Sequence, residues 1–174
     1  TNFGNVLVNN ASQDTSYLQS QLKDIALIID LGGNDWYANV NIPIIDFTGN
    51  DVYESNEDWV LGSGTFDVNF LVDLNGDDQY TVRSGGIGSS LFGVSFFWDL
   101  NGNDKYRCKQ YCLATSFGGV SIFIDEAGHD DYHSSQLSQS VAIAGGYSIL
   151  ADFNGNDSYY SKGETTSGYG EPGQ

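Results

Sequence analysis

The sequence predicts an all-β protein folded as a parallel β-solenoid, or β-helix, with coils of roughly 26 residues. The first observation is an eight-residue pattern, Asp-x-x-Gly-x-Asp-x-Tyr, that occurs six times. The second is its spacing, because the leading Asp residues are 16, 27, 26, 26 and 27 residues apart, a period typical of stacked repeats. The third is a composition with 22 Gly and 2 Pro, in which only residues 17–23 favour a short helix. The six copies span residues 30–37, 46–53, 73–80, 99–106, 125–132 and 152–159.

Each copy predicts a strand, a turn and a second strand. The three residues before every leading Asp are apolar, as at 96–98, and a short apolar run bounded by turn residues predicts a buried strand. The Gly common to all copies predicts a bend, because Gly adopts positive φ without a Cβ clash. After the second Asp the residues alternate, with Tyr106 and Cys108 on one side and Arg107 and Lys109 on the other. Such alternation predicts a strand with one face in water.

The copies divide the chain into three parts. Residues 1–23 lack the pattern and are expected to form an N-terminal cap, 24–160 the solenoid array, and 161–174 a C-terminal tail rich in Gly and Tyr. The 16-residue first spacing leaves no room for a full coil. From residue 70 onward, a second Gly corner and a polar-then-apolar stretch predict a third, shorter strand per coil. Antiparallel blades or hairpins are the alternative topology.

The charge balance restricts the partners. The chain has 23 acidic and 6 basic residues, a net charge of −17, which disfavours nucleic acid and anionic membrane surfaces and favours cations. No run of 18 apolar residues occurs, so we expect no membrane span. The start of the chain lacks the pattern of a secretion signal, so an exported chain is expected to have lost it.

Stacked coils would place equivalent Asp residues in columns. Two carboxylates about 4.8 Å apart repel by roughly 3 to 4 kcal/mol at an effective dielectric constant near 20, so a counter-charge is required. The six basic residues are too few to supply it. We therefore predict cation binding by both Asp columns. The predicted ligands are Asp30, Asp35, Asp46, Asp51, Asp73, Asp78, Asp99, Asp104, Asp125, Asp130, Asp152 and Asp157.

Four copies contain the string Gly-Asn-Asp-x-Tyr, at 33–37, 49–53, 102–106 and 155–159. It resembles the second half of the RTX nonapeptide of secreted bacterial proteins, over five or six residues per repeat. That resemblance implies a calcium-binding parallel β-roll, with calcium held between Asp side chains and main-chain carbonyls of stacked turns. Two leading Gly of the RTX repeat are absent and the period is longer, so at most one calcium per coil is implied. By the resemblance, the ligands are Asp35, Asp51, Asp78, Asp104, Asp130 and Asp157.

The leading Asp of each copy has two interpretations. It adds a metal ligand, or it caps the turn by accepting main-chain N–H groups, as in an Asx turn. An EF-hand is excluded for the string at 73–78, because the bidentate Glu at position 12 of that loop is missing.

Cys108 and Cys112 are four residues apart, a separation of about 13 Å in a straight strand, so a disulfide requires the chain to fold back after Cys108. We expect that disulfide in an exported protein; two free thiols, with Cys108 in the inward position of Val82, are the alternative. His129 and His133 are expected to occupy the positions that Asn103 and Arg107 hold one repeat earlier. Candidate N-glycosylation sites are Asn10 and Asn156.

The function expected from these features is structural and non-catalytic. We expect an exported, calcium-stabilised solenoid at the cell surface or in the extracellular matrix, joining end to end through unpaired strand edges into filaments. One alternative is an adhesin or carbohydrate-binding module that stacks sugars on Trp36 or Trp59. A polysaccharide-degrading enzyme is a further alternative, because four acids lie outside the repeat pattern: Glu54, Glu57, Asp58 and Asp67.

Overall fold

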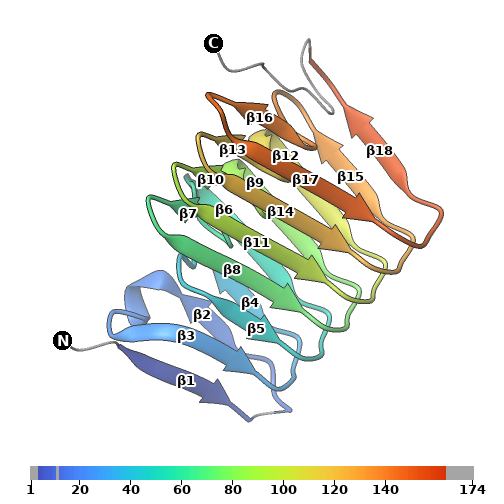
Figure 1. The fold of residues 1–174 in the computed structure, drawn as a ribbon. Coiled ribbons are helices and arrows are strands. Elements are labelled where there is room, and N and C mark those ends of the chain that lie inside the picture. Colours follow the sequence, from blue (N-terminus) through green and yellow to red (C-terminus); the bar gives the residue numbers. More distant parts are fainter. Residues whose placement is uncertain (1–3, 11, 164–174) are drawn as a thin grey trace.

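The computed structural model describes residues 4–10 and 12–163 (Figure 1). Its strands wind into successive coils, and neighbouring coils pair through parallel strands only, apart from one isolated antiparallel bridge. The prediction of an all-β parallel β-solenoid is therefore confirmed. Within the described residues, no helix is long and apolar enough to cross a membrane.

Three sheets form the sides of the solenoid. Sheet A contains β1 (Asn5–Asn9), β3 (Ile25–Asp30), β5 (Ile44–Asp46), β8 (Val68–Asp73), β11 (Val94–Asp99), β14 (Val120–Asp125) and β17 (Tyr147–Asp152). Sheet B contains β2 (Ser16–Leu18), β4 (Trp36–Ala38), β6 (Val52–Asp58), β9 (Gln79–Gly86), β12 (Lys105–Cys112), β15 (Asp131–Ser134) and β18 (Ser158–Ser161). Sheet C is shorter and contains β7 (Gly64–Thr65), β10 (Ser90–Leu91), β13 (Thr115–Phe117) and β16 (Val141–Ile143).

Equivalent residues of successive coils lie beside one another. Asp99 pairs with Asp73 on one side and Asp125 on the other, and Tyr106 is flanked in the same way by Tyr80 and Tyr132. Neighbouring tyrosine rings stack with centroids 4.5 to 4.9 Å apart. The ladder comprises Tyr17, Tyr37, Tyr53, Tyr80, Tyr106, Tyr132 and Tyr159. Offset aromatic stacking of this kind adds to the burial of each ring.

The interior between sheets A and B is filled by this ladder and by the inward residues of sheet A. Phe97 and Phe123 stack at 4.5 Å and meet the ring of Tyr106 edge-on. At the corner with sheet C the interior is polar: buried Ser121 donates to Ser90, which donates to Ser116. The third strand that the sequence predicts is thus present as β10, β13 and β16.

Residues 1–23, expected to form an N-terminal cap, contain an atypical coil of the solenoid. Its strands β1 and β2 add a coil to sheets A and B, with Asn9 beside Asp30 and Tyr17 beside Tyr37. Residues 17–23 contain strand and one short 3-10 turn, Gln19–Gln21, in place of the expected helix. This coil lacks the repeat pattern because Asn9 replaces the leading Asp and Tyr17 follows after eight residues instead of seven. Of the expected tail at 161–174, residues 164–174 lie outside the described residues.

Cys108 and Cys112 form a disulfide with their Cα atoms 6.3 Å apart. Both lie in β12, and the chain folds back between them because Tyr111 has a φ of 56°. The ring of Tyr111 packs on that of Trp59, at 6.5 Å between centroids. Cys108 also occupies the inward-facing position that Val82 occupies in the preceding coil.

The expected reason for the common Gly is wrong in the regular coils. Gly76 and Gly102 are not among the residues with positive φ. A Cβ on Gly102 would instead lie 1.8 Å from the carbonyl oxygen of Gly76, and a Cβ on Gly76 would lie 1.8 Å from that of Gly49. The glycines are therefore required by the close stacking of one turn on the next.

We expect Gly102→Ala to destabilise the fold by more than about 3 kcal/mol, because the added Cβ collides with main-chain atoms that cannot move without separating two coils. Gly145→Ala is the matched control, since its Cβ meets nothing within 4 Å and only its φ of 76° is unfavourable. Its cost should be about 1 to 2 kcal/mol. Urea unfolding measures both, and equal costs would contradict the stacking argument.

Candidate metal centre

The two Asp of each copy meet at the turn that joins sheet A to sheet B. The leading Asp is the last residue of its sheet A strand, and its side chain points inward like that of the residue two positions earlier. The second Asp lies just before the sheet B strand, and it is also buried in the copies from Asp35 to Asp130. Because the turns stack, these carboxyl groups form two inner columns along the solenoid.

The leading Asp residues are hydrogen-bonded to the tyrosine ladder through Oδ2. The hydroxyl group of Tyr80 donates to Asp99 over 2.8 Å, and that of Tyr106 donates to Asp125 over 2.8 Å. Burial raises the pKa of Tyr80 and Tyr106 well above the usual range, so these hydroxyl groups stay protonated. Tyrosine therefore serves the carboxylate column as well as the core. This role of Tyr was not predicted from the sequence. Its signal is the constant spacing of seven residues from leading Asp to Tyr, which also lets Tyr106 donate to Asp99 of its own copy over 3.1 Å.

The Oδ1 atom of the leading Asp is hydrogen-bonded in some of the described coils and has no hydrogen-bond partner in others. In Asp30, Asp46 and Asp73 it accepts the main-chain N–H two residues later, which is the expected Asx turn. In Asp99 and Asp125 it is buried and has no partner among the described residues.

The second Asp of each copy uses its two oxygens separately. Oδ1 of Asp104 accepts the N–H of Asp78 over 2.7 Å, and Oδ1 of Asp130 accepts the N–H of Asp104 over 2.7 Å. Oδ2 is buried without a hydrogen-bond partner among the described residues in Asp35, Asp51, Asp78, Asp104 and Asp130. An unpaired buried carboxylate oxygen is costly, so each of these oxygens requires either a proton or a cation.

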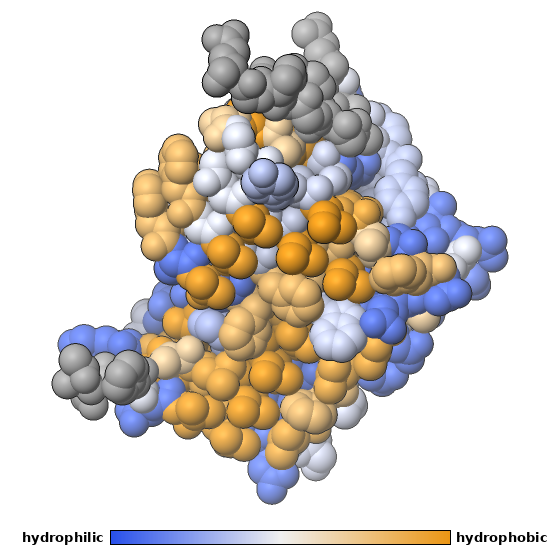
Figure 2. Space-filling model, viewed as in Figure 1, coloured by the Kyte–Doolittle hydropathy of each residue, from blue (hydrophilic) through white to orange (hydrophobic). Residues whose placement is uncertain are grey.

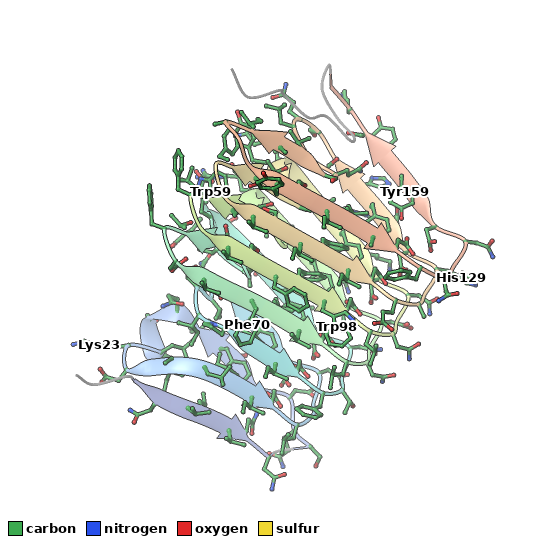
Figure 3. All side chains as sticks on the ribbon, viewed as in Figure 1. Lys23, Trp59, Phe70, Trp98, His129 and Tyr159 are labelled. Atoms are coloured by element: carbon green, nitrogen blue, oxygen red, sulfur yellow. A yellow bond between two sulfur atoms is a disulfide. The ribbon has the colours of Figure 1, made fainter. Side chains whose placement is uncertain are left out.

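The residue before each second Asp forms a separate, exposed ladder. The Asn103 side-chain oxygen accepts the N–H of His129, and Nδ1 of His129 accepts that of Asn156 over 3.0 Å. His129 thus holds the position of Asn103, as expected, and Figure 3 shows it at the edge formed by the turns. His133 lies beside Arg107 and pairs with Asp131 at 3.0 Å.

The structure brings the predicted Asp ligands together in groups of three. In each group, carboxylate oxygens of the three residues lie within 4.8 Å of one another. Two oxygens that bind one calcium ion at about 2.4 Å are at most about 4.8 Å apart, so the oxygens of each group are close enough to bind one such ion. Among the described residues the groups are Asp30, Asp35 and Asp46; Asp51, Asp73 and Asp78; Asp78, Asp99 and Asp104; Asp104, Asp125 and Asp130; and Asp130, Asp152 and Asp157.

Burial and mutual repulsion perturb these carboxyl groups strongly. Burial raises the pKa of Asp78 to about 10, with Asp73 as the strongest charged neighbour. Burial likewise raises the pKa of Asp51 and Asp104 to about 8 and that of Asp46 to about 7, and it holds that of Asp99 well above its usual range. The metal-free columns therefore retain protons near neutral pH.

The other predicted site residues lie apart from the columns. Asp58 pairs with Arg83 at 3.0 Å, and Asp67 accepts the N–H of Thr65 over 2.7 Å. Glu54 and Glu57 are exposed on β6. The predicted glycosylation sites Asn10 and Asn156 are exposed.

We expect the metal-free protein to lose stability as pH rises. Asp titrates near 3.8 when unfolded, whereas Asp46, Asp51 and Asp104 titrate at about 7 to 8 in the fold, so the folded chain holds more protons between these values. This stabilisation is complete below pH 3.8 and is lost as pH rises through about 7 to 8, by about 1.4 kcal/mol per pH unit for each retained proton. Denaturant unfolding in EGTA from pH 5 to pH 9 measures it. Stability that is constant or rises over this range would contradict the buried columns.

The chain was compared with models of protein families, with curated proteins and with solved structures, and no match was found.

Proposed function

We propose that the chain is a calcium-stabilised β-solenoid with a structural, non-catalytic role outside the cell. The observation that carries this proposal is the unpaired Oδ2 of five successive second Asp residues, each within a group of three carboxylates. The two Asp per coil carry two negative charges, so one divalent cation per coil balances the columns. A row of cations between coils replaces the repulsion of stacked carboxylates by attraction on both sides.

Calcium fits the ligands better than other common cations. The groups contain only carboxylate oxygens, without Cys or His, which argues against zinc and copper. Magnesium is smaller, requires a regular octahedron and keeps several of its waters, whereas calcium accepts many carboxylate oxygens in irregular geometry. The RTX resemblance of the turns favours the same ion.

The location outside the cell is supported by two features. The Cys108–Cys112 disulfide suits an oxidising compartment, and carboxylate-rich calcium modules are common in extracellular proteins. End-to-end association into filaments at the cell surface is part of this proposal. Within the described residues β1 and β17 are the outermost strands of sheet A and offer unpaired edges.

Calcium removal is expected to lower the melting temperature at pH 8 by tens of degrees, because several buried carboxylates lose their counter-charge together. Asp104→Asn tests the ligand role, since Asp104 belongs to two groups and Asn retains an oxygen for the N–H of Asp78. In calcium the variant should melt lower than the parent and bind fewer ions by calorimetry. In EGTA at pH 8 it should melt higher, because one buried negative charge is gone.

Asp131→Asn is the control for this pair of measurements. Asp131 lies at the surface, paired with Arg107 at 2.6 Å, and should change little in either buffer, as surface pairs contribute about 0 to 1 kcal/mol. If chelation leaves the melting temperature unchanged and Asp104→Asn behaves alike in both buffers, the columns hold protons and not calcium.

Carbohydrate binding is the second candidate function, and one observation favours it. Trp36 is 40% exposed beside a groove of about 330 Å³ that is also lined by Asn39, Glu54 and Asn56. An aromatic ring with polar neighbours suits a sugar. The other Trp named from the sequence, Trp59, is engaged by Tyr111 and is a weaker candidate. Glycan-array binding that disappears in Trp36→Ala would support this function, and an array without signal would remove it.

A further inference from the structure

The outward side chains of sheet A are apolar in every coil. Figure 2 shows the resulting hydrophobic surface over the front of the molecule, and Figure 3 shows Phe70 and Trp98 on it. Val68 is 68% exposed and Ile149 is 54% exposed. This apolar face comprises Val6, Val8, Leu27, Ile29, Ile45, Val68, Phe70, Val72, Val94, Phe96, Trp98, Val120, Ile122, Ile124, Tyr147, Ile149 and Ala151.

Sheet B shows what a water-facing sheet of the same solenoid looks like. The outward residues of its central strands are polar or charged, as at Thr81, Lys105, Arg107 and His133. Sheet B therefore alternates, whereas sheet A has continuous apolar runs. Continuous runs are typical of parallel strands buried on both faces. In the described part of the chain only the inner face of sheet A is covered, so its sequence indicates a partner on the outer face.

The chemistry of the apolar face restricts that partner. Glu126, which follows β14, accepts a hydrogen bond from Nε1 of Trp98 over 3.0 Å. No basic side chain of the described residues lies among the apolar face, and the net charge is −17, so an anionic lipid surface is disfavoured. A polysaccharide needs many hydroxyl partners, which this face does not offer.

A second copy of the chain fits. Two apolar faces brought together keep the Asp columns apart, because these carboxyl groups lie inside the solenoid at the turns. Sheets pack face to face about 10 Å apart in β-sandwiches, and an isologous pairing needs only one such face.

The area is sufficient for a dimer. Seven strands about 4.8 Å apart and about 20 Å long give a face of about 600 Å². Two copies would bury about 1,200 Å², the lower bound of stable specific interfaces, and the aromatic residues at its centre suit a binding hot spot. We propose that the apolar face of sheet A is the interface of a closed, two-fold homodimer, which is separate from the calcium row and from end-to-end growth.

Sedimentation and light scattering of the whole chain in calcium from 1 to 200 µM test this proposal. The mass should first reach a plateau at twice that of the chain, and any end-to-end growth at higher concentration should proceed from these dimers. Ile122→Lys, in the middle of β14, should weaken dimerisation at least about 100-fold, because an ammonium group would be desolvated without a partner. The matched control is Thr81→Lys on the exposed face of sheet B, which should leave the dissociation constant within about threefold.

Three results would overturn the proposal. They are a monomer at all concentrations, growth directly from monomers without a dimer at low concentration, and a dimer unaffected by Ile122→Lys and Phe96→Lys. Near-UV circular dichroism of the tyrosine ladder shows that each variant is folded, so that loss of the dimer is not confused with unfolding. Melting curves in EGTA report on the calcium row separately, so failure of one proposal leaves the other distinguishable.

Discussion

The whole structure depends on the stacking of equivalent residues of successive coils at the strand spacing of about 4.8 Å. For most side chains this arrangement is favourable: seven tyrosine rings stack, and the residues around Asn103 bond to the main chain of the next coil. For Asp it is unfavourable, because every coil adds a carboxylate beside the previous one. The repeat therefore combines an attractive ladder of Tyr rings with repulsive columns of Asp carboxylates.

The carboxylate oxygens show how the repulsion is managed. In Asp104, Oδ1 accepts the N–H of Asp78 and so fastens one turn to the next, while Oδ2 has no such partner. Joining two coils and binding a cation would thus be compatible roles of this second Asp, because each would use a different oxygen. A proton can satisfy the second oxygen at low pH, and a divalent cation could satisfy it at higher pH. Whether the columns hold protons or cations would therefore depend on the pH and the cation concentration around the protein.

Much of this was accessible from the sequence. The period predicted the parallel stacking, the apolar runs predicted the strands of sheet A, and the third strand per coil is present. The first coil was not predicted, because Asn9 and Tyr17 pair with the next coil as the repeat residues do but differ from the repeat in residue type and in spacing. The requirement at Gly102 was assigned to backbone conformation, although its cause is the carbonyl of Gly76 in another coil. Contacts between coils depend on the spacing of turns in space, which a single copy of the pattern does not reveal.

The strands of sheet A have more apolar residues than the interior of the solenoid requires. A strand that packs one face inward needs an apolar residue at every second position, as β12 shows with Tyr106 and Cys108. In β11, Phe97 meets this need, yet Phe96 and Trp98 are apolar too. Those outward residues add nothing to the interior, so their stabilising effect requires a second surface. The same strands end at the Asp columns, so one sheet carries the buried carboxyl groups at its inner face and the apolar side chains at its outer face.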